Sequence, residues 1–85
     1  MEKIDEVIWT QQYEDDFKKI RDRSTQDKLE KEINKIIHNP AFGKPLKYDL
    51  NGERTIYIKP YRLVYSIEGT KLILLRFEHR KEVYR

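Results

Sequence analysis

The sequence from Arg54 to Arg85, RTIYIKPYRLVYSIEGTKLILLRFEHRKEVYR, decides the expected fold. It contains three runs rich in β-branched and aromatic residues, the composition typical of strands, at 54–59, 61–67 and 70–78. Glu68-Gly69 predicts a two-residue hairpin turn, because glycine takes positive φ without steric cost. Lys59-Pro60 marks the other reversal. The stretch therefore predicts a meander of antiparallel strands.

These two turns set the expected register. The first pairs Ile67 with Thr70 and so sets Arg62 opposite Leu75, while across the second turn Arg62 lies opposite Tyr57. The core face is then expected to carry Ile56, Ile58, Tyr61, Leu63, Tyr65, Ile67, Leu72 and Leu74. The open face is expected to carry Thr55, Tyr57, Arg62, Ser66, Lys71 and His79, with Ile73, Leu75 and Phe77. A slip of one residue exchanges the two faces.

The first part of the chain predicts a strand and two helices. An apolar trio indicates a strand within residues 4–10, and Thr10 suits the N-cap of the helix that follows. The first helical stripe is Tyr13, Phe17 and Ile20, and the second is Leu29, Ile33, Ile36 and Ile37. Ser24 or Thr25 is expected to cap the second helix, which ends near Pro40, since proline disfavours helical geometry in the residue before it. The short polar connection predicts an αα-hairpin.

Residues 1–85 are therefore expected to form one α+β domain. Chains of this length bury only roughly 60–65% of their unfolded surface, so one sheet with helices on one face is about the limit. The expected order is β-α-α-β-β-β, with the helix hairpin packed on one face of a mainly antiparallel sheet. A loop at 39–52 joins the two parts and carries Lys44 and Lys47.

Charge is unevenly distributed along the chain. Residues 1–37 hold 8 Lys and Arg against 10 Asp and Glu, whereas residues 38–85 hold 10 against 5. A strand-rich half with surplus arginine suggests a polyanionic partner. The absence of cysteine excludes disulfides and thiolate metal sites. No signal peptide or membrane span is expected at either end or between, which predicts a cytoplasmic protein that does not contact membranes.

Several kinds of active site are disfavoured. His38 and His79 lie far apart in sequence without acidic residues at ligand spacing, so no metal site is expected. Ser24 and Ser66 lack a recognisable acid and base partner for nucleophilic catalysis. No glycine-rich phosphate loop is present. The chain is therefore expected to work without a metal ion or other cofactor.

The remaining chemistry is a group of cations and aromatic rings. Arg62, Arg80, His79 and Tyr84 could surround a phosphodiester, since an arginine fork binds two phosphate oxygens and stays charged. Tyr57 and Tyr84 can stack on splayed bases. The ordinary alternatives are that Arg62 is a strand residue paired with a glutamate, that His79 is a cap, and that Tyr84 belongs to a frayed terminus.

Three segments, PLKYDLNG, PYRLVYSIEG and FEHRKEVYR, together with the element order, resemble the RelE/ParE superfamily of toxin–antitoxin toxins, most closely archaeal RelE. The YRLVY and HRKEVY segments match the family's YRxxY and HRxxxY signatures. The resemblance implies a microbial-ribonuclease-like fold that cuts mRNA in the ribosomal A site. In this family the ribose 2′-hydroxyl attacks the adjacent phosphate without a metal ion.

The resemblance also implies roles for residues of this chain. Arg62 would bind the phosphate, Arg80 would be a second transition-state arginine, and Tyr84 would orient the nucleotide, with His79 a further catalytic candidate. RNA or ribosome contacts are expected from Lys44, Lys47, Arg54, Tyr57, Lys59 and Lys71. Family members carry paired lysines in the strand before the YR motif; this chain has Arg54-Thr55-Ile56 there, so the general base stays unassigned. Under the expected register Arg80 points away from Arg62, unless the strand ends or bulges first, or the pairing is shifted by one.

The expected partners are a RelB-like antitoxin wrapping the basic and apolar sheet face, the ribosome with its rRNA, and mRNA. Two alternatives remain open. One is a DNA gyrase poison of the ParE branch, which the terminal His79-Arg80-Tyr84 cluster argues against. The other is a non-catalytic RNA-binding or interaction module, although the strand order does not fit an RRM. Codon preference, antitoxin sequence and stoichiometry cannot be derived from the sequence.

Overall fold

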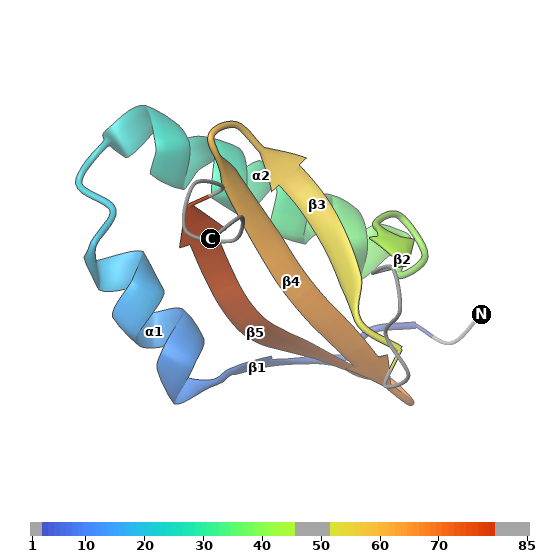
Figure 1. The fold of residues 1–85 in the computed structure, drawn as a ribbon. Coiled ribbons are helices and arrows are strands. Elements are labelled where there is room, and N and C mark those ends of the chain that lie inside the picture. The colour runs from blue at the N-terminus through green and yellow to red at the C-terminus, as the bar shows by residue number, and fades with distance from the viewer. Residues whose placement is uncertain (1–2, 46–51, 80–85) are drawn as a thin grey trace.

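The computed structural model describes residues 3–45 and 52–79, in which one five-stranded sheet carries two helices on one face (Figure 1). The elements are β1 (Glu6–Trp9), α1 (Gln11–Lys18), α2 (Arg23–His38), β2 (Lys44–Pro45), β3 (Arg54–Ile58), β4 (Tyr61–Glu68) and β5 (Lys71–His79). The strand order is β1-β5-β4-β3-β2, with β1 parallel to β5 and the other pairs antiparallel. The expected α+β class, element order and mainly antiparallel sheet are confirmed, while β2 is a short strand that the sequence did not predict.

The first helix begins where the sequence predicted. The Thr10 hydroxyl accepts from the Tyr13 N–H at 3.2 Å and lies 2.9 Å from the Leu74 carbonyl oxygen, to which it donates. One side chain thus ends β1, starts α1 and fastens both to β5. The Thr10 hydroxyl therefore serves both as the N-cap of α1 and as a tertiary contact with β5.

The second helix begins two to three residues earlier than predicted. Asp22, not Ser24 or Thr25, is the N-cap: its carboxylate accepts from the Ser24 N–H at 3.2 Å and from the Thr25 hydroxyl at 2.7 Å. These hydrogen bonds, that of Thr25 first, lower the pKa of Asp22 below its ordinary value. The helix ends at His38, as the proline at position 40 predicted. The Asp22 carboxylate thus satisfies an otherwise unpaired backbone N–H of the first turn and also holds the Thr25 hydroxyl.

The β3–β4 register is the predicted one, with Arg62 opposite Tyr57. The β4–β5 register is different, because Glu68 pairs with Lys71 and the turn lies at Gly69-Thr70, where Gly69 has φ of 61°. The predicted pairing of Ile67 with Thr70 was therefore wrong by two positions. Ile67 instead pairs with Leu72.

A β-bulge changes the register again farther along. Tyr65 pairs with Leu74 but Val64 pairs with Arg76, so Leu75 is an extra residue on β5. A bulge shifts the side-chain alternation by one beyond it. Phe77 therefore lies in the core opposite Leu63, and the prediction that placed it on the open face was wrong.

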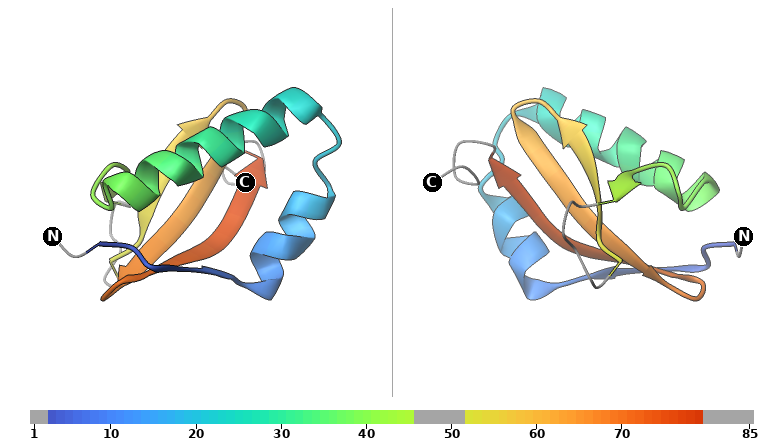
Figure 2. Two further views of the ribbon diagram at one scale, coloured as in Figure 1. Left: turned by 180° about the vertical axis from the view of Figure 1, so that it is seen from behind. Right: turned by 45° about the vertical axis from the view of Figure 1, so that its right-hand side comes forward.

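The core lies between the helices and one face of the sheet. Its members are buried residues from both layers: Ile4, Tyr13, Ile20, Leu29, Ile36, Ile56, Ile58, Leu63, Tyr65, Leu72, Leu74 and Phe77. The left view of Figure 2 shows α2 crossing the sheet, while α1 packs beside β5. The helices occupy one face, as predicted, and the opposite face of β3, β4 and β5 has no helix over it.

Candidate nucleic-acid interface

The open face of the sheet carries a chain of ion pairs formed by Arg62, Glu78, Arg76 and Glu53. Arg62 Nη2 lies 3.0 Å from one carboxylate oxygen of Glu78, and Arg76 Nε lies 2.8 Å from the other. Arg76 Nη2 also lies 3.1 Å from a carboxylate oxygen of Glu53. We call these residues the arginine–glutamate cluster. Their side chains are between 19% and 30% exposed, so the charges are half-buried and weakly screened.

The bulge at Leu75 assembles this cluster. In an unbroken alternation from Leu74, Arg76 would point to the core and Phe77 to the open face. The extra residue reverses both, so that Arg76 lies opposite Val64 and Glu78 lies opposite Arg62. One backbone irregularity thus buries an aromatic ring and aligns two charged residues of β5 with the arginine of β4.

Arg62 lies on β4, a central strand, and on the open face, where the sequence predicted it. Its partner in the structure is Glu78, so Arg62 is a strand residue paired with a glutamate, which was the ordinary alternative expected from the sequence. The Nε atom of Arg62 is buried and has no hydrogen-bond partner. Tyr57, half exposed at 50%, lies opposite Arg62 on β3 and places an aromatic ring beside the cluster.

His79 lies on the other face from Arg62, and the prediction that placed it on the open face was wrong. It pairs with Tyr61, and the two rings meet edge to face with centroids 5.2 Å apart. The bulge explains this placement, since it shifts the alternation of every later residue of β5. Within the part of the chain that the structure describes, His79 is therefore not beside the arginine–glutamate cluster.

Among the described residues, the basic side chains predicted to bind RNA do not form one patch. Arg54 donates from Nη1 to the Gly43 carbonyl oxygen at 2.7 Å, so it fastens the loop before β2 to β3. Lys44 is exposed on β2 at the sheet edge. Lys59 follows β3 and Lys71 begins β5, which places them at opposite ends of the β4–β5 pair. The remaining candidates, Lys47, Arg80 and Tyr84, lie outside the described residues.

Sequence reasoning missed Arg76, Glu78 and Glu53. The signal was the pair Leu74-Leu75 followed by Arg76 and Phe77, which no single strand alternation can satisfy. Such a break is typical of a bulge. A bulge before Arg80 was one of the expected possibilities, and β5 contains one, but its position at Leu75 depends on the pairing with β4.

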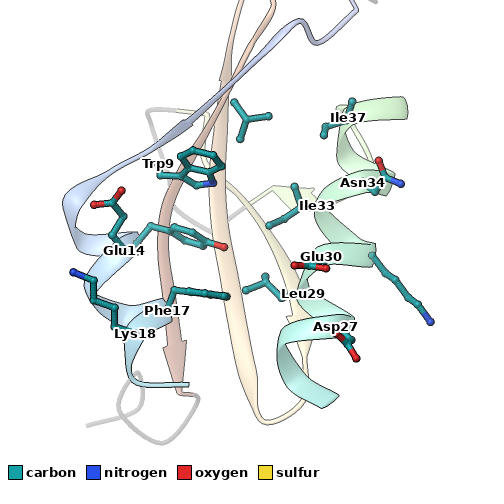
Figure 3. Close-up of a pocket in the computed structure, with 13 residues that line it drawn as sticks. Trp9, Glu14, Phe17, Lys18, Asp27, Leu29, Glu30, Ile33, Asn34 and Ile37 are labelled. Atoms are coloured by element: carbon teal, nitrogen blue, oxygen red, sulfur yellow. The ribbon is translucent and has the colours of Figure 1, made fainter. Parts of the chain in front are cut away.

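A hollow in the described surface lies on the opposite side of the sheet, between the helices (Figure 3). It is a groove of ≈ 1040 Å³ whose floor and walls are mostly apolar. Trp9 and Phe17 project into it from the β1–α1 side, and Leu29 and Ile33 from α2. The two helices therefore leave a groove between them on the sheet face that they cover. The groove and the arginine–glutamate cluster thus lie on different sides of the sheet.

Within residues 3–45 and 52–79, no three His, Asp, Glu or Cys side chains are grouped so that they could hold a metal ion. In the same ranges no helix is both long and apolar enough to cross a bilayer.

Comparisons with known proteins place this architecture in a family. The family model for the ParE toxin of type II toxin–antitoxin systems (parDE) matches residues 7–84. Toxin RelG of Mycobacterium tuberculosis is 42% identical over 45 residues, which span 51% of this chain and 52% of RelG. The chain thus matches about half the length of that relative.

Solved structures match over most of the chain. The RelBE2 toxin–antitoxin complex of Mycobacterium tuberculosis matches with 30% identity and a TM-score of 0.72, covering 87% of this chain and 95% of that one. The RelB–RelE complex of Methanococcus jannaschii matches with 19% identity and a TM-score of 0.75, covering 92% and 95%, and that likeness shows the fold alone. The predicted resemblance is confirmed: the chain belongs to the ParE toxin family of type II toxin–antitoxin systems, within the RelE/ParE superfamily.

Proposed function

We propose that this chain is a ribosome-dependent endoribonuclease toxin that cleaves mRNA in the A site and so inhibits translation. The observation that carries the proposal is the position of Arg62, on a central strand and on the sheet face that neither helix covers. An arginine there can meet a phosphate from solvent, and Tyr57 beside it offers a ring for base stacking. Membership in a family of type II toxins also supports this proposal.

The proposed reaction needs charge stabilisation more than covalent chemistry. The ribose 2′-oxygen bonds to the adjacent phosphorus while the bond from phosphorus to the 5′-oxygen breaks. This leaves a 2′,3′-cyclic phosphate and a 5′-hydroxyl, and the proton lost by the 2′-hydroxyl is balanced by the one gained at the 5′-oxygen. Arg62, with Arg80, neutralises the charge that gathers on the phosphate oxygens. Tyr84 orients the nucleotide, and the ribosome aligns the 2′-hydroxyl for in-line attack.

His79 remains a candidate for proton transfer only if its ring can reach the RNA from the helix side of the sheet. Its ring lies against Tyr61, on the opposite face from Arg62. A catalytic His79 would therefore have to act around the end of β5. His79→Gln is expected to reduce cleavage only if that approach occurs on the ribosome.

Primer extension on mRNA from induced cells tests the proposal. Arg62→Ala is expected to lower cleavage within translated codons by about 100-fold or more, the usual cost of removing a transition-state cation. Arg21→Ala, an exposed arginine between the helices, is the matched control and should cleave like the unaltered protein. Both variants should unfold at similar temperatures, because Glu78 keeps Arg76 as a partner when Arg62 is removed. A folded Arg62→Ala variant that still cuts mRNA would refute the assignment.

The second candidate function is a gyrase poison, favoured by one observation: the matching family model is that of ParE toxins. It predicts growth arrest with intact mRNA and an SOS response. The same induced cultures distinguish the two functions, because cleavage that depends on active ribosomes excludes the gyrase explanation as the cause of arrest.

We also infer an acidic antitoxin as partner. Two similar structures are toxin–antitoxin complexes, the mycobacterial RelBE2 and the Methanococcus jannaschii RelB–RelE complex. A partly helical acidic segment over the open face would neutralise Arg62 and Lys71 and cover the half-buried Ile73 and Leu75. Hydrogen exchange on the complex should protect β4 and β5 amides near these residues. Inhibition of the toxin with unchanged exchange there would show that the antitoxin binds elsewhere.

A further inference from the structure

The arginine–glutamate cluster has a feature that simple cross-strand pairing does not require. Glu78 uses both carboxylate oxygens, one for Arg62 at 3.0 Å and one for Arg76 at 2.8 Å. Arg76 in turn presents Nε to Glu78 and Nη2 to Glu53. Two arginines therefore converge on one shared carboxylate, Glu78, on a sheet surface that no helix covers, and Glu53 contacts Arg76 alone.

A carboxylate in this position is a chemical substitute for a phosphate. Both are oxyanions that accept two parallel hydrogen bonds from a guanidinium fork. Two arginines that converge on one carboxylate can converge equally on the non-bridging oxygens of one phosphodiester. The two nitrogen donors that converge on Glu78, one from each arginine, are of the kind that binds a phosphate, and they are occupied by the protein's own carboxylate.

We propose that Arg76 is a second phosphate-binding residue beside Arg62, and that Glu78 and Glu53 occupy the two arginines until an RNA phosphate displaces them. This proposal rests on the proposed function, because it assigns further residues to the same site. Arg76 would touch the phosphate directly. Glu78 and Glu53 act through the arginines and are positioning residues.

The contacts of Arg62 support such an exchange. Its Nε atom is buried without a hydrogen-bond partner, a condition that costs free energy in a folded protein. The pose that Glu78 imposes on Arg62 is therefore incompletely satisfied. If the Arg62 guanidinium rotates toward an RNA phosphate, its Nε–H gains an acceptor, which favours replacement of Glu78 by the phosphate.

Charge leads to the same conclusion. The cluster of two arginines and two glutamates has no net charge, although residues 38–85 carry a surplus of positive charge. As long as the glutamates stay paired, the cluster attracts a polyanion weakly. Removing one carboxylate leaves an arginine half-buried and unneutralised, which raises its affinity for phosphate.

The test measures RNA binding by the full-length chain, separately from cleavage. The probe is a short fluorescein-labelled single-stranded 2′-O-methyl RNA, which has no free 2′-hydroxyl and cannot be cut by the proposed reaction. Fluorescence anisotropy gives the dissociation constant at several salt concentrations. Glu78→Gln is expected to tighten binding about three- to tenfold, because an ion pair of intermediate exposure no longer competes with the phosphate.

Glu68→Gln is the matched control. Glu68 lies on β4 on the same face as Arg62, so this variant changes net charge equally but leaves the cluster intact. It is expected to change affinity less than about twofold. A purely structural role for Glu78 predicts a lower unfolding temperature for Glu78→Gln and an affinity equal to that of Glu68→Gln, whereas displacement of Glu78 by phosphate predicts tighter binding than that control. If Glu78→Gln binds no more tightly than Glu68→Gln, the competition is refuted.

Arg76→Gln tests the second half of the proposal. It should weaken binding about tenfold and reduce the salt dependence of log K by about 0.7, the contribution of one phosphate contact on a single strand. Unchanged affinity and slope would show that Arg76 only neutralises the glutamates. Glu53→Gln frees only one nitrogen of Arg76 and should tighten binding less than Glu78→Gln, which provides a second variant if Glu78→Gln does not fold.

The two proposals can fail separately. Cleavage that depends on Arg62, together with equal affinities for Glu78→Gln and Glu68→Gln, would refute the competition and keep the ribonuclease. Tighter binding by Glu78→Gln without any mRNA cleavage would keep the phosphate site and refute the ribonuclease.

Discussion

At the scale of single residues, Tyr65 links the sheet to the loop that follows α2. Its ring is fully buried, and its hydroxyl accepts from the Gly43 N–H at 2.8 Å and donates to the Pro40 carbonyl oxygen at 3.1 Å. Burial raises the pKa of Tyr65, although the Gly43 N–H opposes the change. The same contact explains the glycine: a Cβ at position 43 would lie 2.7 Å from the Tyr65 hydroxyl oxygen.

Tyr65→Phe removes this hydroxyl and leaves two buried backbone groups without a partner. We expect the free energy of unfolding to fall by about 1–3 kcal/mol, the usual cost of an unsatisfied buried polar group. Urea denaturation followed by circular dichroism measures it. The reference is Glu68→Gln, an exposed change expected to cost less than about 0.5 kcal/mol. If Tyr65→Phe is as stable as this reference, the hydroxyl contributes nothing to holding the loop.

At the scale of elements, β5 decides which side chains share a face. Its Leu75 bulge separates a first half, in which Leu72 and Leu74 are buried, from a second half in which Phe77 is buried. The spacing of two and then three residues cannot be met by one regular strand. The bulge is therefore required by the apolar pattern, and the placement of Arg76 and Glu78 on the open face follows from it.

The start of α2 gives a prediction about pH. Hydrogen bonds from Thr25 and Ser24 lower the pKa of Asp22 from its ordinary 3.8. A lowered folded-state pKa means that this contribution to stability is present above about pH 3.8 and is lost as the pH falls through the folded-state value. Asp22→Asn keeps an amide cap that does not titrate. As the pH falls, the free energy of unfolding of the unaltered protein should therefore decrease more than that of Asp22→Asn. Urea denaturation at several pH values measures both. A difference that stays constant between pH 6 and pH 2 would contradict the cap's role.

At the scale of the whole molecule, one core joins the helices to the sheet, so the ionisation of a core group affects the entire fold. Tyr13 of α1 is such a group, 5% exposed and part of that core. Burial, aided by the nearby charge of Glu30, raises its pKa from 10.0 to about 12. The folded state thus holds Tyr13 neutral at pH values where the unfolded chain ionises.

The sign follows from the raised pKa. The contribution of Tyr13 is fully present below pH 10 and is lost as the pH rises toward about 12. Tyr13→Phe cannot ionise, so its stability should fall less steeply between pH 10 and pH 12 than that of the unaltered protein. Thermal unfolding across that range tests this. Parallel slopes would mean that the Tyr13 hydroxyl reaches solvent in the folded state.

The sequence by itself determined what depends on near neighbours. The Thr10 cap, the end of α2 before Pro40, the strands β1, β3, β4 and β5, and the register across Lys59-Pro60 follow from turn chemistry and apolar spacing. Arg62 as a candidate followed from its motif. The site around it did not follow, because the β4–β5 turn lies at Gly69-Thr70 and a bulge shifts the strand once more.

Only the tertiary structure decided which side chains accompany Arg62. Packing of Phe77 into the core reverses the alternation of β5, which carries His79 to the helix side and brings Arg76 and Glu78 to the open face. The short strand β2 likewise exists because β3 offers it an edge. The same physical reason explains the faces of β5 and the presence of β2. Local preferences fix the conformation of a segment, whereas the face that a strand presents depends on which partner residues best bury its apolar side chains.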